Sequence, residues 1–394
     1  MIVRKIKPEE RRRTEELFSI AFATPLSEDA YPLEKYAAFL DDNETMTSCL
    51  SVTPYSVNFD GSQVNMAGIG GVSSLPHYRR TGGIRGCFEA MLPTLYREGY
   101  MLSMLYPFST NYYRKFGYEV WSRGVRYELI LSYLPAMPKV GHAMLVDADN
   151  RKECLADIQA LTELWEMHYN GMAKLDQRAY GFVTEADPYR KQEFVYVYYD
   201  SVGVPAGYMV FRKEVLTEGQ RLVCSRFVFR DKTGLLGLLA LAKSFAADYK
   251  SIVFVLPRSL RIDPVIDEWA FSAITRSDTS LGMVRFINVE AALLAASYRG
   301  EGEITLDIWD NQIPENNGVF YVRFRDGRAI QVEHTEQKTA DLRMEISEFS
   351  RFLMGAVDTS ALAYSDRVAG YTEQKRGVLG NIFYEKPCFL TEYF

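Results

Sequence analysis

The stretch Leu75–Gly86, LPHYRRTGGIRG, places two adjacent arginines almost directly before two glycines. An alternating, strand-like run, QVNMAGIGGVSSL, leads into it, and an amphipathic, helix-like run, GCFEAMLPTLYREG, follows it. A glycine turn that opens a helix leaves several backbone N–H groups without intrahelical partners and directs them toward one point. The stretch therefore predicts a phosphate-binding turn between a strand and a helix.

The composition is that of a globular protein. The chain has 394 residues, with 47% hydrophobic and 24% charged residues, which favours about two to three domains. No apolar run is long enough to span a bilayer and no signal peptide is recognisable, so we expect no membrane insertion. The five cysteines lack CxxC pairing and the four histidines lack metal-site spacing, which favours a cytoplasmic location and no metal. The net charge of −6 argues against nucleic-acid binding.

Residues 1–128 have the pattern of a mixed α/β unit. We expect, in order, a strand, a helix opened by Pro8, strands joined at Asp60-Gly61, the arginine–glycine turn with its helix, a strand MLSMLYP, a short helix TNYYRKFG and a closing strand near VRYELILSY. The predicted ligand turn lies where a strand is followed by a helix.

Residues 129–283 repeat this order. We expect a helix CLADIQALTELWEMHY, the strands EFVYVYY, AGYMVF and RLVCSRFVF, a helix LLGLLALAKSFAADY and a strand SIVFVL. The equivalent turn, FRDKTGLLG, contains the acidic Asp231 and lacks the arginine pair. This pattern predicts a structural copy that has lost the phosphate site.

Residues 284–394 predict a compact α+β domain. The helix-like runs NVEAALLAASY and ISEFSRFLMGA flank the strand pair EITLDIWD and GVFYVRFRDG. No low-complexity linker separates the three parts, so we expect tight interfaces.

Three features of the first part, VSSLPHYRRTGGIRG, the strand end YPFSTN and the run YYRKFGYEV, together resemble the GNAT acetyltransferases. The tail of the family's motif A ends here in Ile84, where general GNAT proteins carry a small residue. With the three-part layout, the whole chain resembles the enhanced intracellular survival (Eis) family. This resemblance implies α/β and α+β parts: tandem GNAT folds, the second degenerate, and a C-terminal sterol-carrier-protein-like domain.

The resemblance implies acetyl-CoA as the acetyl donor. A helix N-terminus suits its pyrophosphate, glycines let the backbone approach closely, and arginines add charge-assisted hydrogen bonds. The end of the preceding strand can pair with the pantetheine amides, and by resemblance one N–H there holds the thioester oxygen. The predicted contacts are Arg80, Thr81, Gly82, Gly83, Ile84 and Arg85 in the turn, Val72, Ser73 and Ser74 at the strand end, and Phe108 and Ser109 across the cleft.

Two catalytic roles follow from the resemblance. Tyr113, which opens YRKFGY, corresponds to the general acid that protonates the departing thiolate, and its neighbour Tyr112 is the competing assignment. The C-terminal carboxylate, here that of Phe394, corresponds to the group that accepts the proton of the amine. Apolar anchors near the end of YEKPCFLTEYF favour a terminus held in a cleft.

The other candidates have simpler explanations. We expect His77 to be a surface residue and Cys87 a packing residue. Solvated loops are the simpler interpretation of a group of carboxylates that could instead line an amine pocket, namely Glu28, Asp29, Glu34, Asp41 and Asp42.

The function implied by the resemblance is direct transfer of an acetyl group from acetyl-CoA to a primary amine, on an aminoglycoside-like polyamine or a lysine side chain. It also implies a homo-hexamer. The alternative is a non-enzymatic acyl-CoA or lipid-binding protein that uses the C-terminal domain as a carrier. The arginine turn and Tyr113 favour the enzyme, and the residues leave the physiological amine open.

Overall fold

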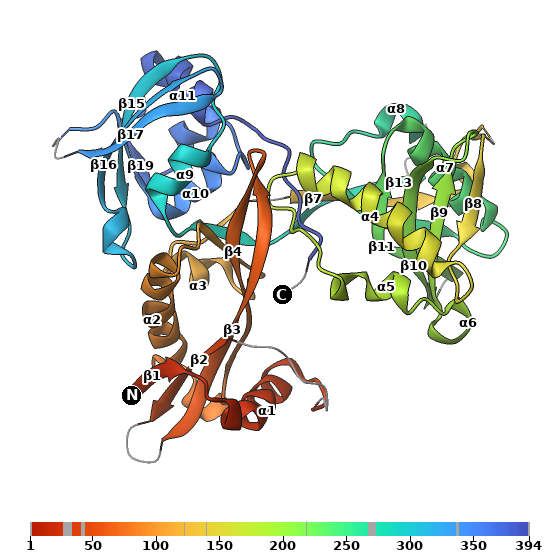
Figure 1. Ribbon diagram of the computed structural model, residues 1–394, viewed down its shortest axis with the longest axis horizontal. Coiled ribbons are helices and arrows are strands. Elements are labelled where there is room, and N and C mark those ends of the chain that lie inside the picture. Colours follow the sequence, from red (N-terminus) through yellow and green to blue (C-terminus); the bar gives the residue numbers. More distant parts are fainter. Residues whose placement is uncertain are drawn as a thin grey trace. The chain divides into compact units, whose positions relative to one another are not determined.

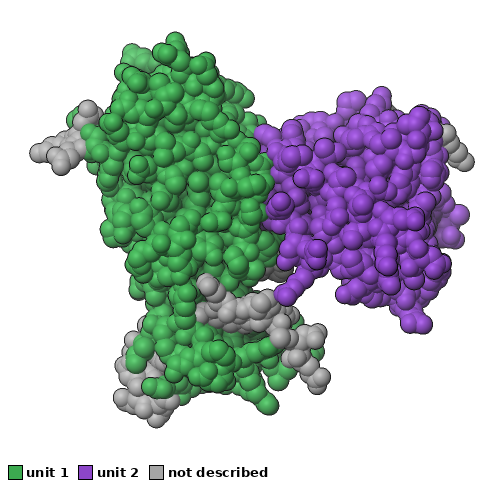
Figure 2. Space-filling view, viewed as in Figure 1, with its two compact units in different colours: residues 1–122, 281–386, 392–394 green, residues 123–280, 387–391 purple. Residues whose placement is uncertain are grey.

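The computed structural model of the protein describes residues 2–26, 34–40, 44–121, 123–138, 140–217, 219–266, 273–335 and 339–392. These residues form three sheets with helices packed against them (Figure 1). The chain divides into two compact units, coloured separately in Figure 2. Unit 1 contains residues 1–122, 281–386 and 392–394, and unit 2 contains residues 123–280 and 387–391.

The first sheet belongs to unit 1. Its described strands follow the order β1 (Ile2–Lys5), β2 (Glu34–Leu40), β3 (Thr45–Phe59), β4 (Ser62–Ser74), β5 (Leu102–Leu105), β14 (Met283–Phe286) and β6 (Glu119–Val120). Strands β4 and β5 run parallel, and the other neighbours run antiparallel.

The second sheet, in unit 2, has the same arrangement. Its described strands follow the order β8 (His142–Leu145), β9 (Glu193–Tyr199), β10 (Pro205–Leu216), β11 (Gly219–Phe229), β12 (Ser251–Pro257), β7 (Arg123–Ile130) and β13 (Ile274–Ser280). Again the fourth and fifth strands, β11 and β12, are parallel. The predicted repeat is therefore present, with matching strand order and direction in both sheets.

The two sheets exchange their sixth strands. The run VRYELILSY was expected to close the first sheet, but β7 pairs with β12 and β13 in the second sheet. In return, β14 lies between β5 and β6 of the first sheet. The predicted domain boundaries at 128/129 and 283/284 consequently fall inside β7 and β14, because local sequence pattern does not indicate which sheet a strand joins.

Helices cover both faces of the first sheet. Successive side chains of a strand point to opposite faces, so buried residues of one strand contribute to two separate clusters. Helix α2 (Gly83–Arg97) contributes Phe88 and Met91 to a core that includes Tyr36 and Ala38. Helix α1 (Arg11–Phe22) contributes to a second cluster on the other face. The sheet therefore fixes where α2 begins, next to the end of β4.

The third sheet lies in the C-terminal part of unit 1. Its described strands follow the order β17 (Arg328–Thr335), β16 (Gly318–Arg325), β15 (Gly302–Trp309), β18 (Leu342–Glu345) and β19 (Val368–Ala369). Helix α9 (Val289–Ala295) packs against β17, α11 (Arg376–Ile382) against β15, and α10 (Ile346–Leu353) against β18 and β14. This part is the predicted α+β domain.

The remaining helices are α3 (Thr110–Arg114), α4 (Arg151–His168), α5 (Gly181–Thr184), α6 (Pro188–Lys191), α7 (Lys232–Ser244) and α8 (Asp263–Ile266). Within the described ranges, the structure has no helix with the length and apolar character that crossing a membrane requires.

Candidate active site

The site begins where β4 outlasts its parallel neighbour. Pairing between β4 and β5 runs from Met66 opposite Leu102 to Ile69 opposite Leu105, where β5 ends. Strand β4 continues to Ser74, and among the described strands it pairs there with β3 alone, on its other side. The predicted contact residues 72–74 therefore present a strand edge that β5 does not cover, and such an edge can pair with amide groups of a ligand.

The side chains at this strand end are already engaged in the protein. The Ser73 hydroxyl lies 3.3 Å from the Cys49 sulfur and donates to the Gly71 carbonyl at 3.1 Å. The Ser74 hydroxyl lies 2.8 Å from that of Ser48. The backbone of this segment, rather than its hydroxyls, is the part that remains for a ligand.

The arginine–glycine turn is built around two residues with positive φ. Arg80 has φ 68° and Gly82 has φ 94°, so the backbone reverses just before α2. The Thr81 hydroxyl stabilises the turn by donating to the Tyr78 carbonyl at 2.7 Å. A Cβ atom on Gly82 would meet nothing within 4 Å, whereas one on Gly83 would lie 2.4 Å from the Ser48 hydroxyl.

The N-terminus of α2 is open. Gly82 is its N-cap residue, and no described side chain caps it. The first intrahelical hydrogen bond runs from the Gly86 N–H to the Gly82 carbonyl, which leaves the N–H groups of the first helical turn available. These groups and the positive end of the helix dipole suit a phosphate.

Three exposed arginines surround this helix end. Arg79, Arg80 and Arg85 are all exposed, and within the described part of the chain none of them forms an ion pair with a carboxylate. Ile84, the bulky residue of the motif, is half-buried and packs against the core of the first sheet. The turn therefore combines backbone donors with unneutralised positive charge.

Helix α3 places two tyrosines beside the end of β5. Ser109 precedes the helix, and its carbonyl accepts hydrogen bonds from the N–H groups of Tyr112 and Tyr113. Phe108 is 72% exposed, and its ring lies edge-on to Tyr113 with 5.2 Å between the centroids. The predicted residues 108, 109 and 113 therefore lie together.

The two tyrosines differ in burial. Tyr113 is 2% exposed, and burial, followed by the neighbouring Tyr112 and Tyr118, raises the pKa of its phenol above the usual value near 10. Tyr112 is half-buried, and burial also raises its pKa. Both phenols therefore stay protonated near neutral pH, the form that a general acid needs.

The chain end approaches the same strand end. The hydroxyl of Tyr106, the residue after β5, donates to the backbone carbonyl of Glu392 at 2.8 Å. Upstream, Phe389 and Leu390 are buried, as expected for apolar anchors. Phe394 itself lies outside the described residues.

The minor candidates divide as follows. Burial raises the pKa of the Cys87 thiol to about 12, which fits a packing residue and not a nucleophile. His77 is exposed, as expected. Glu28, Asp29, Asp41 and Asp42 lie outside the described residues, as does the side chain of Glu34.

The corresponding turn of unit 2 is closed by its own carboxylate. Asp231 is the N-cap of α7 and accepts a hydrogen bond from the Gly234 N–H at 3.1 Å. Arg230, the single arginine of this turn, is paired with Asp231 at 2.8 Å and with Asp200 at 3.1 Å. A phosphate would have to displace this carboxylate.

Sequence reasoning missed the residues that hold α3 from the C-terminal part of unit 1. Arg285 donates to the Phe116 carbonyl at 2.6 Å, and Glu119 is bonded by Arg114 at 2.8 Å and by Arg367 at 2.8 Å. A signal was present in Gly117 of the YRKFGY motif, because a glycine at a turn often marks a close approach by another group.

The C-terminal part also contains a cleft of about 530 Å³ on the solvent side of the third sheet. Half of its twelve lining residues are polar or charged, among them Asp307, Arg343, Glu345 and Asp366, and the exposed Trp309 lies beside them. Among the described residues, no cluster of histidine, cysteine or carboxylate side chains could hold a metal ion.

Comparison with known proteins agrees with these features. Residues 3–121 match the acetyltransferase (GNAT) domain family, and residues 289–390 match the sterol carrier protein domain family. None of the curated proteins compared with the sequence is a match.

Several solved structures have a similar fold over the whole chain. A probable N-acyltransferase from Enterococcus faecalis V583 is 23% identical, with a TM-score of 0.87 over 100% of this chain and 99% of that one. A GCN5-related N-acetyltransferase from Anabaena variabilis ATCC 29413 is 18% identical, with a TM-score of 0.87 over 100% of both chains. Eis1 from Mycobacterium abscessus is 16% identical, with a TM-score of 0.81 over 100% of both chains.

These likenesses confirm the resemblance drawn from the sequence. Apart from β14, the first sheet with its turn coincides with the matched acetyltransferase range. The second sheet repeats its strand order without the ligand turn, and the third sheet lies in the matched sterol carrier domain. The chain therefore carries a GNAT acetyltransferase domain over residues 3–121, within a fold like that of Eis1 and of the probable N-acyltransferase.

Proposed function

We propose that the protein transfers the acetyl group of acetyl-CoA to a primary amine of an aminoglycoside-like polyamine or a lysine side chain. The single observation that carries this proposal is the open N-terminus of α2, surrounded by exposed arginines and adjacent to the uncovered edge of β4. A cofactor with a pyrophosphate and an amide-bearing arm needs both features in this order.

The residues fit such a donor. Of the N–H groups from Arg80 to Arg85, that of Thr81 donates to the Tyr78 carbonyl at 3.4 Å, and the others would hold the pyrophosphate. The backbone of Val72, Ser73 and Ser74 would pair with the amides of the arm. An N–H of the same strand end would hold the thioester oxygen as negative charge develops on it. Acetyl-CoA supplies the activated acetyl group.

Two groups would manage the protons. The amine nitrogen forms a bond to the acetyl carbon while the carbon–sulfur bond breaks, and Tyr113 gives its proton to the leaving sulfur. The carboxylate of Phe394 would accept the proton that the amine loses. The hydrogen bond between Tyr106 and Glu392 supports this role. It holds Glu392, two residues before Phe394, next to the end of β5.

The alternative is a carrier that binds an acyl chain without catalysis. The described cleft of the C-terminal part does not favour it, because five of its twelve lining residues are charged and an alkyl chain gains little from charged side chains. Acetyl-CoA binding without turnover of any amine would support the carrier instead.

The test is a screen of amines for thiol release from acetyl-CoA, combined with calorimetry. We expect one acetyl-CoA site per chain and turnover with at least one polyamine or lysine peptide. No turnover with any amine, at concentrations where acetyl-CoA is bound, would contradict the proposal.

A further inference from the structure

We propose that Arg285, held by Asp310, is a positioning residue for Tyr113, so that the C-terminal part of unit 1 sets the geometry of the acid. This inference rests on the proposed function, in which Tyr113 protonates the leaving sulfur. Arg285 lies on β14 and Asp310 directly follows β15. Neither belongs to the matched acetyltransferase range, residues 3–121.

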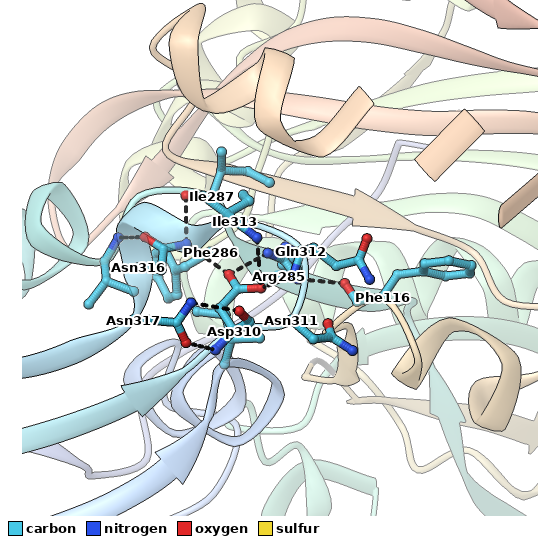
Figure 3. A network of polar contacts seen from close by, with 12 residues as sticks. Phe116, Arg285, Phe286, Ile287, Asp310, Asn311, Gln312, Ile313, Asn316 and Asn317 are labelled. Atoms are coloured by element: carbon cyan, nitrogen blue, oxygen red, sulfur yellow. Dashed lines mark hydrogen bonds and ion pairs between the residues drawn. The ribbon is translucent and has the colours of Figure 1, made fainter. Parts of the chain in front are cut away.

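Arg285 contacts the turn that follows Tyr113. The Tyr113 carbonyl accepts hydrogen bonds from the N–H groups of Phe116 at 2.9 Å and Tyr118 at 3.4 Å, which folds the chain back at the end of α3. The carbonyl of Phe116 points outward from this turn and accepts a hydrogen bond from Arg285 at 2.6 Å (Figure 3). The guanidinium therefore fixes the backbone three residues after the acid.

Arg285 in turn is fixed by a buried carboxylate. Its other terminal nitrogen pairs with Asp310, and both side chains are 0% exposed. Burial, the largest effect, disfavours the charged form of Asp310. The charge of Arg285 and hydrogen bonds from Arg285 and Asn316 outweigh it, and the pKa of this carboxyl is lowered. The Asp310 carboxylate therefore stays ionised beside the guanidinium.

The loop after β15 is built to hold this carboxylate (Figure 3). Asp310 accepts hydrogen bonds from the backbone of Gln312 at 2.9 Å and Ile313 at 3.2 Å, and from the Asn316 amide at 2.9 Å. Asn317 brackets the backbone of Asp310 with two hydrogen bonds of 2.8 Å. A carboxylate with this many partners has little freedom to move.

The motif itself is shaped around Arg285. Gly117 has φ 79°, and a Cβ atom there would lie 2.1 Å from the terminal nitrogen of Arg285 and 2.7 Å from the Ile346 side chain. Glycine in YRKFGY is therefore needed for the arginine to reach the Phe116 carbonyl.

A second group of ion pairs, around Glu119, also holds the turn that follows Tyr113. Arg114, the residue after Tyr113, makes two hydrogen bonds of 2.8 Å to Glu119, which is 1% exposed. Arg367, from the C-terminal part, pairs with Glu119 at 2.8 Å and also with Glu348. Two arginine contacts from outside the acetyltransferase range thus fix α3, and a misplacement of about 1 Å can cost an enzyme about 100-fold in rate.

The test is a double-mutant cycle on kcat. Arg285→Lys keeps the positive charge beside Asp310 but removes the planar guanidinium, which bonds Asp310 and the Phe116 carbonyl at the same time. We expect kcat to fall about 10- to 100-fold with an unchanged Kd for acetyl-CoA. In the Tyr113→Phe background, the same change should alter kcat by no more than about twofold, because the acid it positions is already gone.

The matched control is Tyr298→Phe. This change also removes a buried hydrogen bond from a side chain to a backbone carbonyl, 2.6 Å long, in the C-terminal part of unit 1 but away from α3. It should leave kcat within about twofold of wild type. If Arg285→Lys folds poorly, the paired change Arg285→Met with Asp310→Asn removes both charges together, and the same result is expected.

The outcomes separate the two claims. Equal losses of kcat in the wild-type and Tyr113→Phe backgrounds, wild-type kcat in Arg285→Lys, or unfolding of both Arg285 variants would assign the pair to general stability and overturn the inference alone. A wild-type protein that turns over no amine would overturn the proposed function as well.

Discussion

The segments β4–turn–α2 and β11–turn–α7 differ in their turns, although the two sheets have the same strand order and directions. Residues 75–82 separate β4 from α2, and only Arg230 and Asp231 separate β11 from α7. In both sheets the fourth strand continues beyond its pairing with its parallel neighbour. Pairing between β11 and β12 stops at Val223, after which β11 continues to Phe229 and β12 to Pro257. The scaffold of a cofactor site is therefore present twice.

The difference lies in what satisfies the helix N-terminus. In the second turn, the Asp231 carboxylate accepts the Gly234 N–H and neutralises Arg230, and the Trp165 indole donates to the Phe229 carbonyl at 2.8 Å. In the first turn, the helix begins at a glycine and the arginines are exposed. A strand arrangement alone is not a binding site, because one acidic residue can occupy the donors that a phosphate would need.

The largest expected effect concerns the acid. Tyr113→Phe should lower kcat about 10²- to 10⁴-fold, the usual range for a general acid. We expect no compensation from unit 2, because Asp231 occupies its turn. Affinity for acetyl-CoA should change little, since the ring remains. Tyr112→Phe should be mild, and steady-state kinetics of both variants checks this. The reverse order of effects would move the acid to Tyr112.

The wild-type pH profile gives an independent check on the acid. Because burial raises the pKa of Tyr113, the protonated form persists above its usual value near 10. We therefore expect no loss of kcat from deprotonation of the acid below about pH 10. A descending limb near neutral pH that disappears in Tyr113→Phe would contradict this assignment of the pKa.

The next effect concerns the chain terminus. Removing Phe394 shifts the terminal carboxylate back by one residue, about 3.3 to 3.6 Å of chain, which exceeds the tolerance of a hydrogen bond. Turnover should fall by about 10² or more while calorimetry still finds one bound acetyl-CoA. Phe394→Leu keeps the carboxylate and should retain much of the activity. Full turnover in a chain extended by a few residues would exclude the terminus from the reaction.

A smaller effect is expected on acetyl-CoA affinity, and it should occur at the first turn and not at the second. Gly82→Val adds a side chain at φ 94°, where branched residues are strained, and places it in the open space before α2. We expect acetyl-CoA affinity to fall by about 100-fold, equivalent to about 3 kcal/mol. Lys232→Ala, at the second turn, should leave the affinity unchanged. Calorimetry that finds two equal sites per chain would break the comparison.

The smallest expected effect is on the stability of unit 2, when the carboxylate that closes its turn is removed. Asp231→Ala removes the N-cap of α7 and should destabilise unit 2 by about 1 kcal/mol without creating an acetyl-CoA site. Burial opposes ionisation of Asp231, but Arg230 and the N–H of Gly234 lower its pKa overall. The stabilisation is therefore present above the unfolded pKa of about 4 and is lost as the pH falls below it.

Urea unfolding at neutral and acidic pH measures this difference. The difference between the variant and the wild type should shrink as the pH falls below about 4, because the carboxylate loses its charge. A variant that gains a second acetyl-CoA site would show that Asp231 alone had closed the turn.

Local features of the fold could be predicted because the residues that decide them lie close together. The turn before α2, the strand β9 and the capped turn at Asp231 each follow from a few neighbouring residues. The exchange of β7 and β14 could not be predicted, since both strands have the apolar pattern of any buried strand and the choice of sheet is a tertiary effect.

The candidate site was predictable to the same extent. The turn and Tyr113 follow from motifs, whereas Arg285 reaches Phe116 from 169 positions further along the chain. No periodicity connects residues so far apart. The roles of Tyr113 and Phe394 remain predictions that only kinetics can decide.

The exchanged strands also set the order of events during synthesis. Strand β14 is translated after the whole second sheet, yet it fills the place between β5 and β6. At about 5 to 20 residues per second, the first sheet waits roughly 8 to 30 s on the ribosome with the edge of β5 unpaired. An unpaired edge of this kind invites aggregation, so the nascent chain has a period in which chaperone protection matters most. An N-terminal fragment released before β14 would carry every residue of the arginine turn and still lack a completed sheet to hold it.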